Sequence, residues 1–425
     1  MMFLTIAMQS LTALTFAGAA ILLLARPRVA QSVLAPLPSG RWGRLILGGL
    51  VLLPGLALGL SIAVPFFAFF AAALAAAIAL VVGGYALASG VRTIWPFPVG
   101  IVLASALIAA FQPLGLKVML LPKADNLPYE PVSAAVVKTY DEGVWFESAR
   151  AGADGTLYLA ANIGIDFSRG DYYRRAQGVV IARKPDGTER ILFRTPTGSA
   201  AGVFAVAPDG TLYMSSNGVT PGIWRITQDG RGEMLTRLPK GAWPNGLDFG
   251  PDGNIYSPDS ALGLVWRINP HSGDAEPAVK DPALSARPFI ALAPGANGLH
   301  FKGRVMIVTV SDSTKVLSFE MDNTGMFSAP KVLASGIPGD DFAIGRDGSL
   351  FITTHPYNTL VKVAPDGRRS IIGDARDAII GATDAVFGTT DADRDTLYVA
   401  TDGGAFTGGP KTRGQLVALK PYAPH

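Results

Sequence analysis

The order of hydrophobic and polar residues divides the chain into two parts. Up to residue 124 the chain consists of long apolar runs at 2–24, 45–88 and 95–116, and it contains no Asp or Glu. About 20 apolar residues cross the hydrocarbon core of a bilayer, and Pro65 would interrupt helical hydrogen bonding within the longest run. The pattern therefore predicts an all-α bundle of four transmembrane helices in a region at residues 1–120, with the run at 45–88 forming two of them.

After residue 125, short apolar runs alternate with turns in a recurring phrase. Asp-Gly followed by Leu-Tyr or a similar pair occurs at 153–158, 208–213, 251–256 and 346–351, and weaker copies occur at 302–307 and 394–398. Asp-Gly between two β-type runs is a strong hairpin signal, typical of type I′ turns, which need positive φ. A second hairpin follows each copy, so each repeat supplies four strands.

Six such repeats predict an all-β six-bladed β-propeller at 141–425, joined to the helices by a linker at 121–140. A β-sandwich is the alternative, but sandwiches lack a regular repeat of roughly 45 residues. The run at 414–420 is expected to close the ring of blades.

The charges are divided in the same way as the hydrophobicity. Seven of the 36 basic residues lie before residue 125, whereas all 33 acidic residues lie after it, so the sequence pI of about 9.0 reflects the N-terminal part. By the positive-inside rule, the loops with Arg26, Arg28, Arg41, Arg44 and Arg92 would be cytoplasmic. We therefore expect an integral membrane protein with the bilayer as a partner and its propeller on the periplasmic or extracellular side. Nucleic acid is not an expected partner.

Equivalent positions in the six repeats predict a ring of polar side chains around the propeller axis. Counting back seven residues from the turn aspartate in four repeats, and aligning the other two by their phrases at 297–301 and 387–388, gives the axial ring, which consists of Glu147, Gly202, Asn245, Asn297, Asp340 and Thr383. Two carboxylates and two amides at Glu147, Asn245, Asn297 and Asp340 form a hard, oxygen-only ligand set. Such a set suits one divalent cation, Ca²⁺ first and Mg²⁺ or Mn²⁺ next. The alternative is that the Asn and Asp residues form turns by bonding to their own backbone, which does not explain Glu147.

The phrases Trp243-Pro-Asn-Gly-Leu-Asp-Phe249, Gly295-Ala-Asn-Gly-Leu-His-Phe301 and Gly339-Asp-Asp-Phe342 resemble those of the senescence marker protein/gluconolactonase family, which includes regucalcin. The resemblance covers about 140–425 and none of the N-terminal part. It implies a six-bladed propeller with one divalent ion bound by Glu, two Asn and Asp, and it implies lactone hydrolysis with the ligating Asp as proton acceptor. Ser148-Ala149-Arg150 departs from the Pro and Trp that usually follow the family's Glu. Residues 353–358 and 401–404 look more like strictosidine-synthase-like propellers, some of which are not hydrolases.

These observations predict a metal-dependent hydrolase of a lactone or related ester. Asp340 is the expected general base, and Thr383, Asp341 and His355 are the expected substrate contacts. Residues 164–175 are a candidate lid, and His300 is more readily explained as a structural residue. Two alternatives remain open: a non-hydrolytic propeller enzyme, and a ligand-binding or sensor propeller. The chain has no Cys, which excludes thiol nucleophiles and thiolate metal sites.

Overall fold

The computed structural model describes residues 2–25, 41–63, 68–88, 96–110, 121–166, 174–287, 291–422. It divides into two compact units, Met1–Leu116 and Lys117–His425. The loop with Arg26 and Arg28, Arg92, and most of the candidate lid at 164–175 lie outside the described residues.

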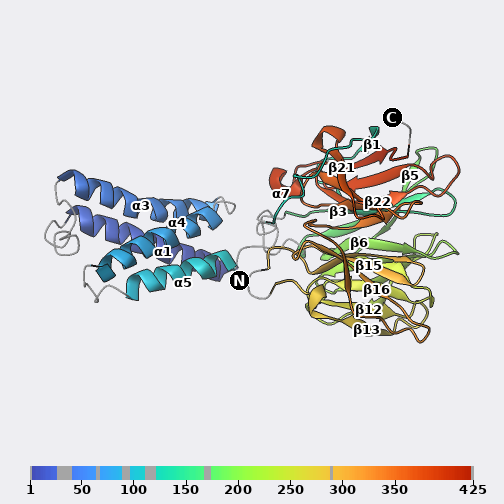
Figure 1. Cartoon of the computed structure of the whole chain (residues 1–425), viewed down its shortest axis with the longest axis horizontal. Coiled ribbons are helices and arrows are strands. Elements are labelled where there is room, and N and C mark those ends of the chain that lie inside the picture. Colours follow the sequence, from blue (N-terminus) through green and yellow to red (C-terminus); the bar gives the residue numbers. More distant parts are fainter. Residues whose placement is uncertain are drawn as a thin grey trace. The chain divides into compact units, whose positions relative to one another are not determined.

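The first unit contains helices that pack through their apolar faces (Figure 1). The described helices are α1 (Met2–Ala25), α3 (Arg41–Ala63), α4 (Ala68–Ala88) and α5 (Pro96–Ala110). Neighbouring helices contact one another in the cycle α1, α3, α4, α5 and back to α1. Phe16, Leu58, Ala75 and Ile108 are part of the core, and a buried hydrogen bond of 3.0 Å joins Gln9 to Ser61.

The prediction of four transmembrane helices is wrong. Within the described residues, none of the helices combines the length and the hydropathy needed to cross a bilayer. The helix α5, for example, has 15 residues, and a rise of about 1.5 Å per residue gives it less than the roughly 30 Å of the hydrocarbon core. The predicted localisation as an integral membrane protein, with the propeller on the outer face, is wrong for the same reason.

The second unit is a β-propeller made of antiparallel sheets (Figure 1). Its first three groups of strands are β2 (Trp145–Ala151), β3 (Leu157–Ile163), β4 (Gln177–Arg183), β5 (Glu189–Arg194); β6 (Ser199–Val206), β7 (Leu212–Gly218), β8 (Gly222–Ile226), β9 (Gly232–Arg237); and β10 (Asp248–Phe249), β11 (Ile255–Asp259), β12 (Leu264–Ile268), β13 (Ala275–Lys280).

The remaining groups are β14 (Ala296–Lys302), β15 (Val305–Val310), β16 (Lys315–Glu320), β17 (Lys331–Ser335); β18 (Phe342–Ile344), β19 (Leu350–Thr353), β20 (Thr359–Val363), β21 (Arg369–Asp374); and β22 (Ala382–Phe387), β23 (Leu397–Thr401), β24 (Gln415–Leu419) with β1 (Ala134–Thr139). Short helical turns η5 (Pro282–Leu284), η6 (Ala375–Asp377) and α7 (Ala405–Gly408) lie in the connections. The first strands β2, β6, β10, β14, β18 and β22 contact one another in a closed cycle around the axis.

Six separate blades are not what the described sheets form. There are four four-stranded sheets and one eight-stranded sheet, because a parallel bridge between Gln177 and Ser199 joins β4 to β6. The strand β24 closes the ring as expected, and it pairs with β1 from the other end of the propeller chain. This β1 lies within the segment expected to be a linker.

The repeated Asp-Gly turns form hairpins, but they are not of type I′. In the first of them Gly155 has a φ of 80°, Asp154 does not have positive φ, and the Gly155 N–H donates to the Gly152 carbonyl. That geometry is typical of a type I turn followed by a left-handed glycine. The Asp154 side chain accepts hydrogen bonds from the backbone and side chain of Thr156, which explains why Asp precedes Gly in the repeat.

The turns and the loops lie at opposite ends of the sheets. Because strands alternate in direction, the Asp-Gly hairpins share one end, called the turn end below. The connections between second and third strands, and the crossovers between sheets, share the other end, called the loop end. Each first strand starts at the loop end, so residues at the start of these strands meet around the axis at that end.

Candidate functional site

The six axial-ring residues lie at or just before the start of the first strands, where strand pairing is interrupted. The register of β2 shifts around Glu147, that of β14 around Asn297, and that of β22 around Thr383. Gly202 occupies the same kind of irregularity in β6, whereas Asn245 and Asp340 precede the short strands β10 and β18. A bulge adds a residue that the partner strand does not match, and it re-aims the side chain.

Backbone hydrogen bonds hold four ring residues side by side. The N–H of Gly246 donates to the Asn297 carbonyl at 2.9 Å, and the N–H of Gly298 donates to the Asp340 carbonyl at 3.0 Å. The N–H of Asp341 continues the series to the Thr383 carbonyl at 3.3 Å. The structure therefore brings Asn245, Asn297, Asp340 and Thr383 together in the predicted order.

The glycine of each Asn-Gly pair is required by the close approach of the next sheet. A Cβ at Gly246 would lie 2.7 Å from the Asn297 carbonyl oxygen, and a Cβ at Gly298 would lie 2.5 Å from an Asp341 side-chain oxygen. Neither glycine has positive φ. The Asn-Gly phrase is therefore explained by packing around the axis and not by a turn.

Hydroxyl groups on the second strands fix the ring carbonyls. Ser215 donates to the Asn245 carbonyl and Thr309 donates to the Asp340 carbonyl, both at 2.5 Å. Thr353 donates in the same way to the Thr383 carbonyl at 2.9 Å. These hydroxyls were not among the predicted site residues, although each occupies the same place in its repeat.

The two asparagine amides are oriented by their NH₂ groups. Asn297 Nδ2 donates to Ser311 Oγ at 2.8 Å and to Asp340 Oδ1 at 2.6 Å, and Asn245 Nδ2 lies 3.3 Å from Ser260 Oγ. Within the described residues, the Oδ1 atom of neither amide has a hydrogen-bond partner. Two carbonyl oxygens are therefore left available for a ligand at the axis.

The two ring carboxylates are buried without enough positive charge. Burial, and after it the neighbouring Asp340 charge, raise the pKa of Glu147 to about 8. Burial and the Asp341 charge likewise raise the pKa of Asp340 to about 7, although His355 opposes the shift. A bound cation would relieve this unfavourable arrangement.

These residues fit the hard divalent cation that the sequence predicts. The parts of the chain described here contain no group of three or more His, Cys, Asp or Glu side chains arranged for a metal ion. A cation at the ring would be held by two carboxylates, Glu147 and Asp340, together with the amide oxygens of Asn245 and Asn297. Oxygen-only sets of this kind are typical of hard divalent cations.

His355 lies on the loop between β19 and β20, beside the ring. Its Nδ1 is 3.6 Å from Asp340 Oδ2, and its Nε2 is 2.9 Å from Asp402 Oδ2. Burial lowers the pKa of His355, but the Asp402 carboxylate outweighs that effect and the pKa is raised to about 9. The Phe406 ring contacts the imidazole edge to face at 4.7 Å between centroids.

Thr383 and Asp341, the other expected substrate contacts, have partners of their own. The Thr383 hydroxyl donates to the Ala400 carbonyl at 3.1 Å. The Asp341 carboxylate accepts from Arg150 at 3.1 Å and from the Phe342 N–H at 2.9 Å. Both side chains therefore serve to hold the innermost strands in place.

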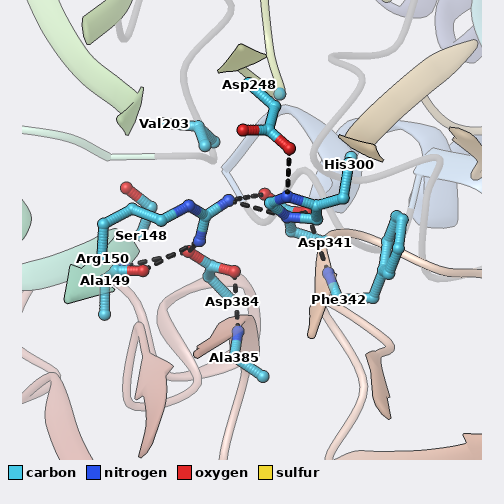
Figure 2. A network of polar contacts seen from close by, with 12 residues as sticks. Ser148, Ala149, Arg150, Val203, Asp248, His300, Asp341, Phe342, Asp384 and Ala385 are labelled. Atoms are coloured by element: carbon cyan, nitrogen blue, oxygen red, sulfur yellow. Dashed lines mark hydrogen bonds and ion pairs between the residues drawn. The ribbon is translucent and has the colours of Figure 1, made fainter. Parts of the chain in front are cut away.

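Asp341 belongs to a second group of buried and partly buried side chains, called the charge layer, shown in Figure 2. It consists of Arg150, Asp248, His300, Asp341 and Asp384. Arg150 lies at its centre and donates to Asp384 Oδ2 at 2.5 Å and to Asp341 Oδ2 at 3.1 Å. The charge layer therefore joins five of the six first-strand regions.

The His300 imidazole completes the charge layer. His300 Nδ1 is 3.3 Å from Asp248 Oδ2, and its Nε2 lies 2.9 Å from Arg150 and 3.2 Å from Asp341 Oδ1. Burial and Arg150 lower the pKa of His300, whereas the Asp341 and Asp248 carboxylates raise it to about 9. Although burial opposes it, the pKa of Asp341 is lowered, first by Arg150 and then by His300.

The sequence contains a signal for this layer that was not used. Arg150, Asp248 and His300 each follow a ring residue by three positions, and Asp341 and Asp384 each follow one directly. These two repeated offsets from the ring residues identify the five residues of the charge layer together. Asp402, the partner of His355, was noticed only as part of a motif.

No family model matches the chain, and no curated protein matches it. Similar solved structures include gluconolactonases and a regucalcin, the kinds of protein that the sequence resembles.

Three of these structures illustrate the range. A gluconolactonase from Xanthomonas campestris is 19% identical, with a TM-score of 0.48, over 71% of this chain and 96% of its own. A luciferin-regenerating enzyme is 14% identical, with a TM-score of 0.49, over 69% of this chain and 96% of its own. A calcium-binding regucalcin from Agrobacterium tumefaciens is 14% identical, with a TM-score of 0.48, over 69% and 95%. Values this low carry no argument about activity, which has to come from the site itself.

Proposed function

We propose that this protein is a metal-dependent hydrolase of a lactone or related ester, acting at the axial ring. The observation that carries the proposal is the arrangement around Asp340. This buried carboxylate lies against the Asn297 amide at 2.6 Å and near the His355 imidazole at 3.6 Å, within a ring of oxygen ligands.

Glu147, Asn245, Asn297 and Asp340 would hold the cation, Ca²⁺ by preference. When bound, the cation would polarise the ester carbonyl as a Lewis acid. Gly202, the ring position without a side chain, lies between Glu147 and Asn245 and supplies no oxygen ligand. A Cβ there would lie 2.4 Å from Ser215 Oγ, so no larger residue fits.

The chain's own residues supply the proton transfer. Asp340 accepts a proton from the attacking water as general base, since its carboxylate lies at the ring beside the position of the cation. His355, held through Nε2 by Asp402, places a positive charge beside Asp340 and is available to donate a proton to the leaving alkoxide. Asn297, fixed by Ser311, keeps the carboxylate in place.

A lactone panel tests the proposal. Full-length protein is freed of metal with a chelator and then assayed with and without Ca²⁺, Mg²⁺ or Mn²⁺, with product mass as the readout. We expect turnover only with metal, and a mass gain of one water. Asp340→Asn and Asn297→Ala should each reduce kcat/KM at least about 100-fold, the range typical of a general base.

Asp366→Asn is the matched control, because Asp366 is an exposed carboxylate in a turn-end hairpin. It should leave kcat/KM unchanged. Turnover that is independent of metal, or that survives both ring substitutions, would refute the proposal.

A non-hydrolytic reaction is the second candidate, and the buried His355–Asp402 pair favours it. The protonated imidazole of such a pair could protonate the leaving carboxylate while Asp340 removes a proton from carbon, which would open a lactone by elimination. The product would then have the same mass as the substrate and a new double bond. Metal binding without turnover of any lactone would favour a ligand-binding or sensor propeller instead.

A further inference from the structure

Apolar side chains gather at the loop end, immediately beside the ring. One cluster contains Trp145, Ile165, Ala200 and Ala405, with Phe406 packed against it. Trp145 and Ala200 each precede a ring residue by two positions, so they belong to the same first strands as Glu147 and Gly202. This cluster therefore borders the ring on the loop-end side.

A second apolar cluster borders His355. It contains Leu121, Ala293 and Tyr357, with Leu292 and again Phe406 packed against it. Phe406 thus joins both clusters and also contacts the His355 ring at 4.7 Å. An aromatic side chain that is half-buried and touches the acid–base histidine lies where a substrate substituent would pass.

The loop end differs in this respect from the turn end. Its loops carry exposed apolar residues, with Val219 at 70% and Leu262 at 42% exposure. The turn end presents the repeated Asp-Gly hairpins, whose carboxylates bond their own turns, with Met326 as an exposed apolar residue in one of its hairpins. A polyhydroxylated sugar lactone needs hydrogen-bond partners for each hydroxyl, because an unpaired buried polar group costs about 1–3 kcal/mol. The side chains that gather around Phe406 offer apolar contacts instead.

We infer that the substrate is a lactone or ester with an apolar alkyl or aromatic substituent, which packs against Phe406 and its neighbours. This inference rests on the proposed function for the reacting group and adds the class of its substituent. Burial of each methylene contributes roughly 0.8 kcal/mol, which corresponds to about a fourfold gain in kcat/KM per carbon while contact continues.

A homologous series tests the inference. Full-length, Ca²⁺-loaded protein is assayed with γ-lactones that carry side chains of one to eight carbons, and with glucono-δ-lactone. Binding of the same compounds to metal-free protein is followed separately by tryptophan fluorescence. We expect kcat/KM and affinity to rise about two- to fourfold per carbon over the first several carbons, with the sugar lactone the poorest.

Phe406→Ala should reduce kcat/KM for the eight-carbon lactone at least tenfold more than for the one-carbon lactone. Val332→Ala is the matched control, because Val332 is an exposed apolar residue on the outermost strand β17. It should leave the whole series unchanged.

The outcomes distinguish the apolar class of the substrate from the proposed hydrolase activity. Equal or faster turnover of the sugar lactone, or no dependence on chain length, would overturn the apolar class and leave the hydrolase standing. If no lactone were turned over, the hydrolase would fail. Fluorescence would then decide the class alone: affinity that rises with chain length and is lost in Phe406→Ala supports it, and a flat series overturns it.

Discussion

The axial ring and the charge layer are two adjacent groups of buried polar residues that differ in how their charges are balanced. In the charge layer, the carboxylates of Asp341 and Asp384 share the Arg150 guanidinium, although burial still raises the pKa of Asp384 to about 7. In the ring, Glu147 and Asp340 face each other's charge, and the pKa values of both are raised. Both groups come from the same first strands, only one to three residues apart.

The difference separates a structural role from a functional one. Buried charges that pair with one another hold strands together and need nothing further. Buried charges that repel one another lower the stability of the fold, and they persist where a ligand compensates for them. We therefore place ligand binding in the ring and strand alignment in the charge layer.

The largest expected effect comes from breaking the charge layer. Arg150→Met leaves Asp341 and Asp384 buried without their cation, which typically costs about 3–5 kcal/mol. We expect the free energy of unfolding of the propeller, measured by urea denaturation, to fall by that amount.

Arg225→Met is its control. Arg225 pairs with Glu233 on strands β8 and β9, where both side chains are partly exposed, and such pairs contribute about 1 kcal/mol or less. Equal losses of unfolding free energy in Arg150→Met and Arg225→Met would mean that the charge layer stabilises the fold no more than a surface ion pair does.

A change of pH is expected to have a smaller effect on the folding stability of the metal-free protein. Since the pKa values of Glu147 and Asp340, about 8 and about 7, lie above those of free carboxyl groups, the folded protein holds more protons than the unfolded chain between about pH 4 and pH 8. Its stability should therefore fall as the pH rises. The raised pKa values of His300 and His355 act in the same direction up to about pH 9.

Calorimetry in the presence of chelator measures this effect. We expect the Tm to fall from pH 5 to pH 9. At pH 8, Glu147→Gln should raise the Tm of metal-free protein by about 2 °C or more, roughly 1 kcal/mol for a domain of this size, and should abolish stabilisation by Ca²⁺. A Tm that rose across this range would show that the ring carboxylates are not in conflict.

An effect of similar size, on metal affinity, is expected from the residues that orient the ring. Ser311→Ala removes the hydroxyl that accepts from Asn297 at 2.8 Å, and loss of such an outer contact typically weakens metal binding about tenfold. Titration calorimetry with Ca²⁺ measures the loss. Ser328→Ala, which changes an exposed serine before β17, should leave the affinity unchanged. Unaltered affinity in Ser311→Ala would mean that Asn297 does not ligate.

Several features follow from the sequence by itself. The period of the Asp-Gly phrase determines repeated hairpins, because Asp bonds its own turn and Gly adopts positive φ. Equal offsets from those turns, and matching phrases in the two repeats where the turn differs, determine which residues meet at the axis, since repeats related by rotation place equivalent positions together. The positions of Asn245, Asn297, Asp340 and Thr383 could therefore be predicted in order.

Other features were decided only by the tertiary structure. The apolar runs of the first unit indicated helices, but whether a helix can cross a bilayer depends on where each one begins and ends. Charge pairing depends on distances between strands far apart in sequence: Arg150 and Asp384 meet although they are 234 positions apart. Which buried carboxylates find a partner, and which remain for a ligand, is set by these contacts and not by local pattern.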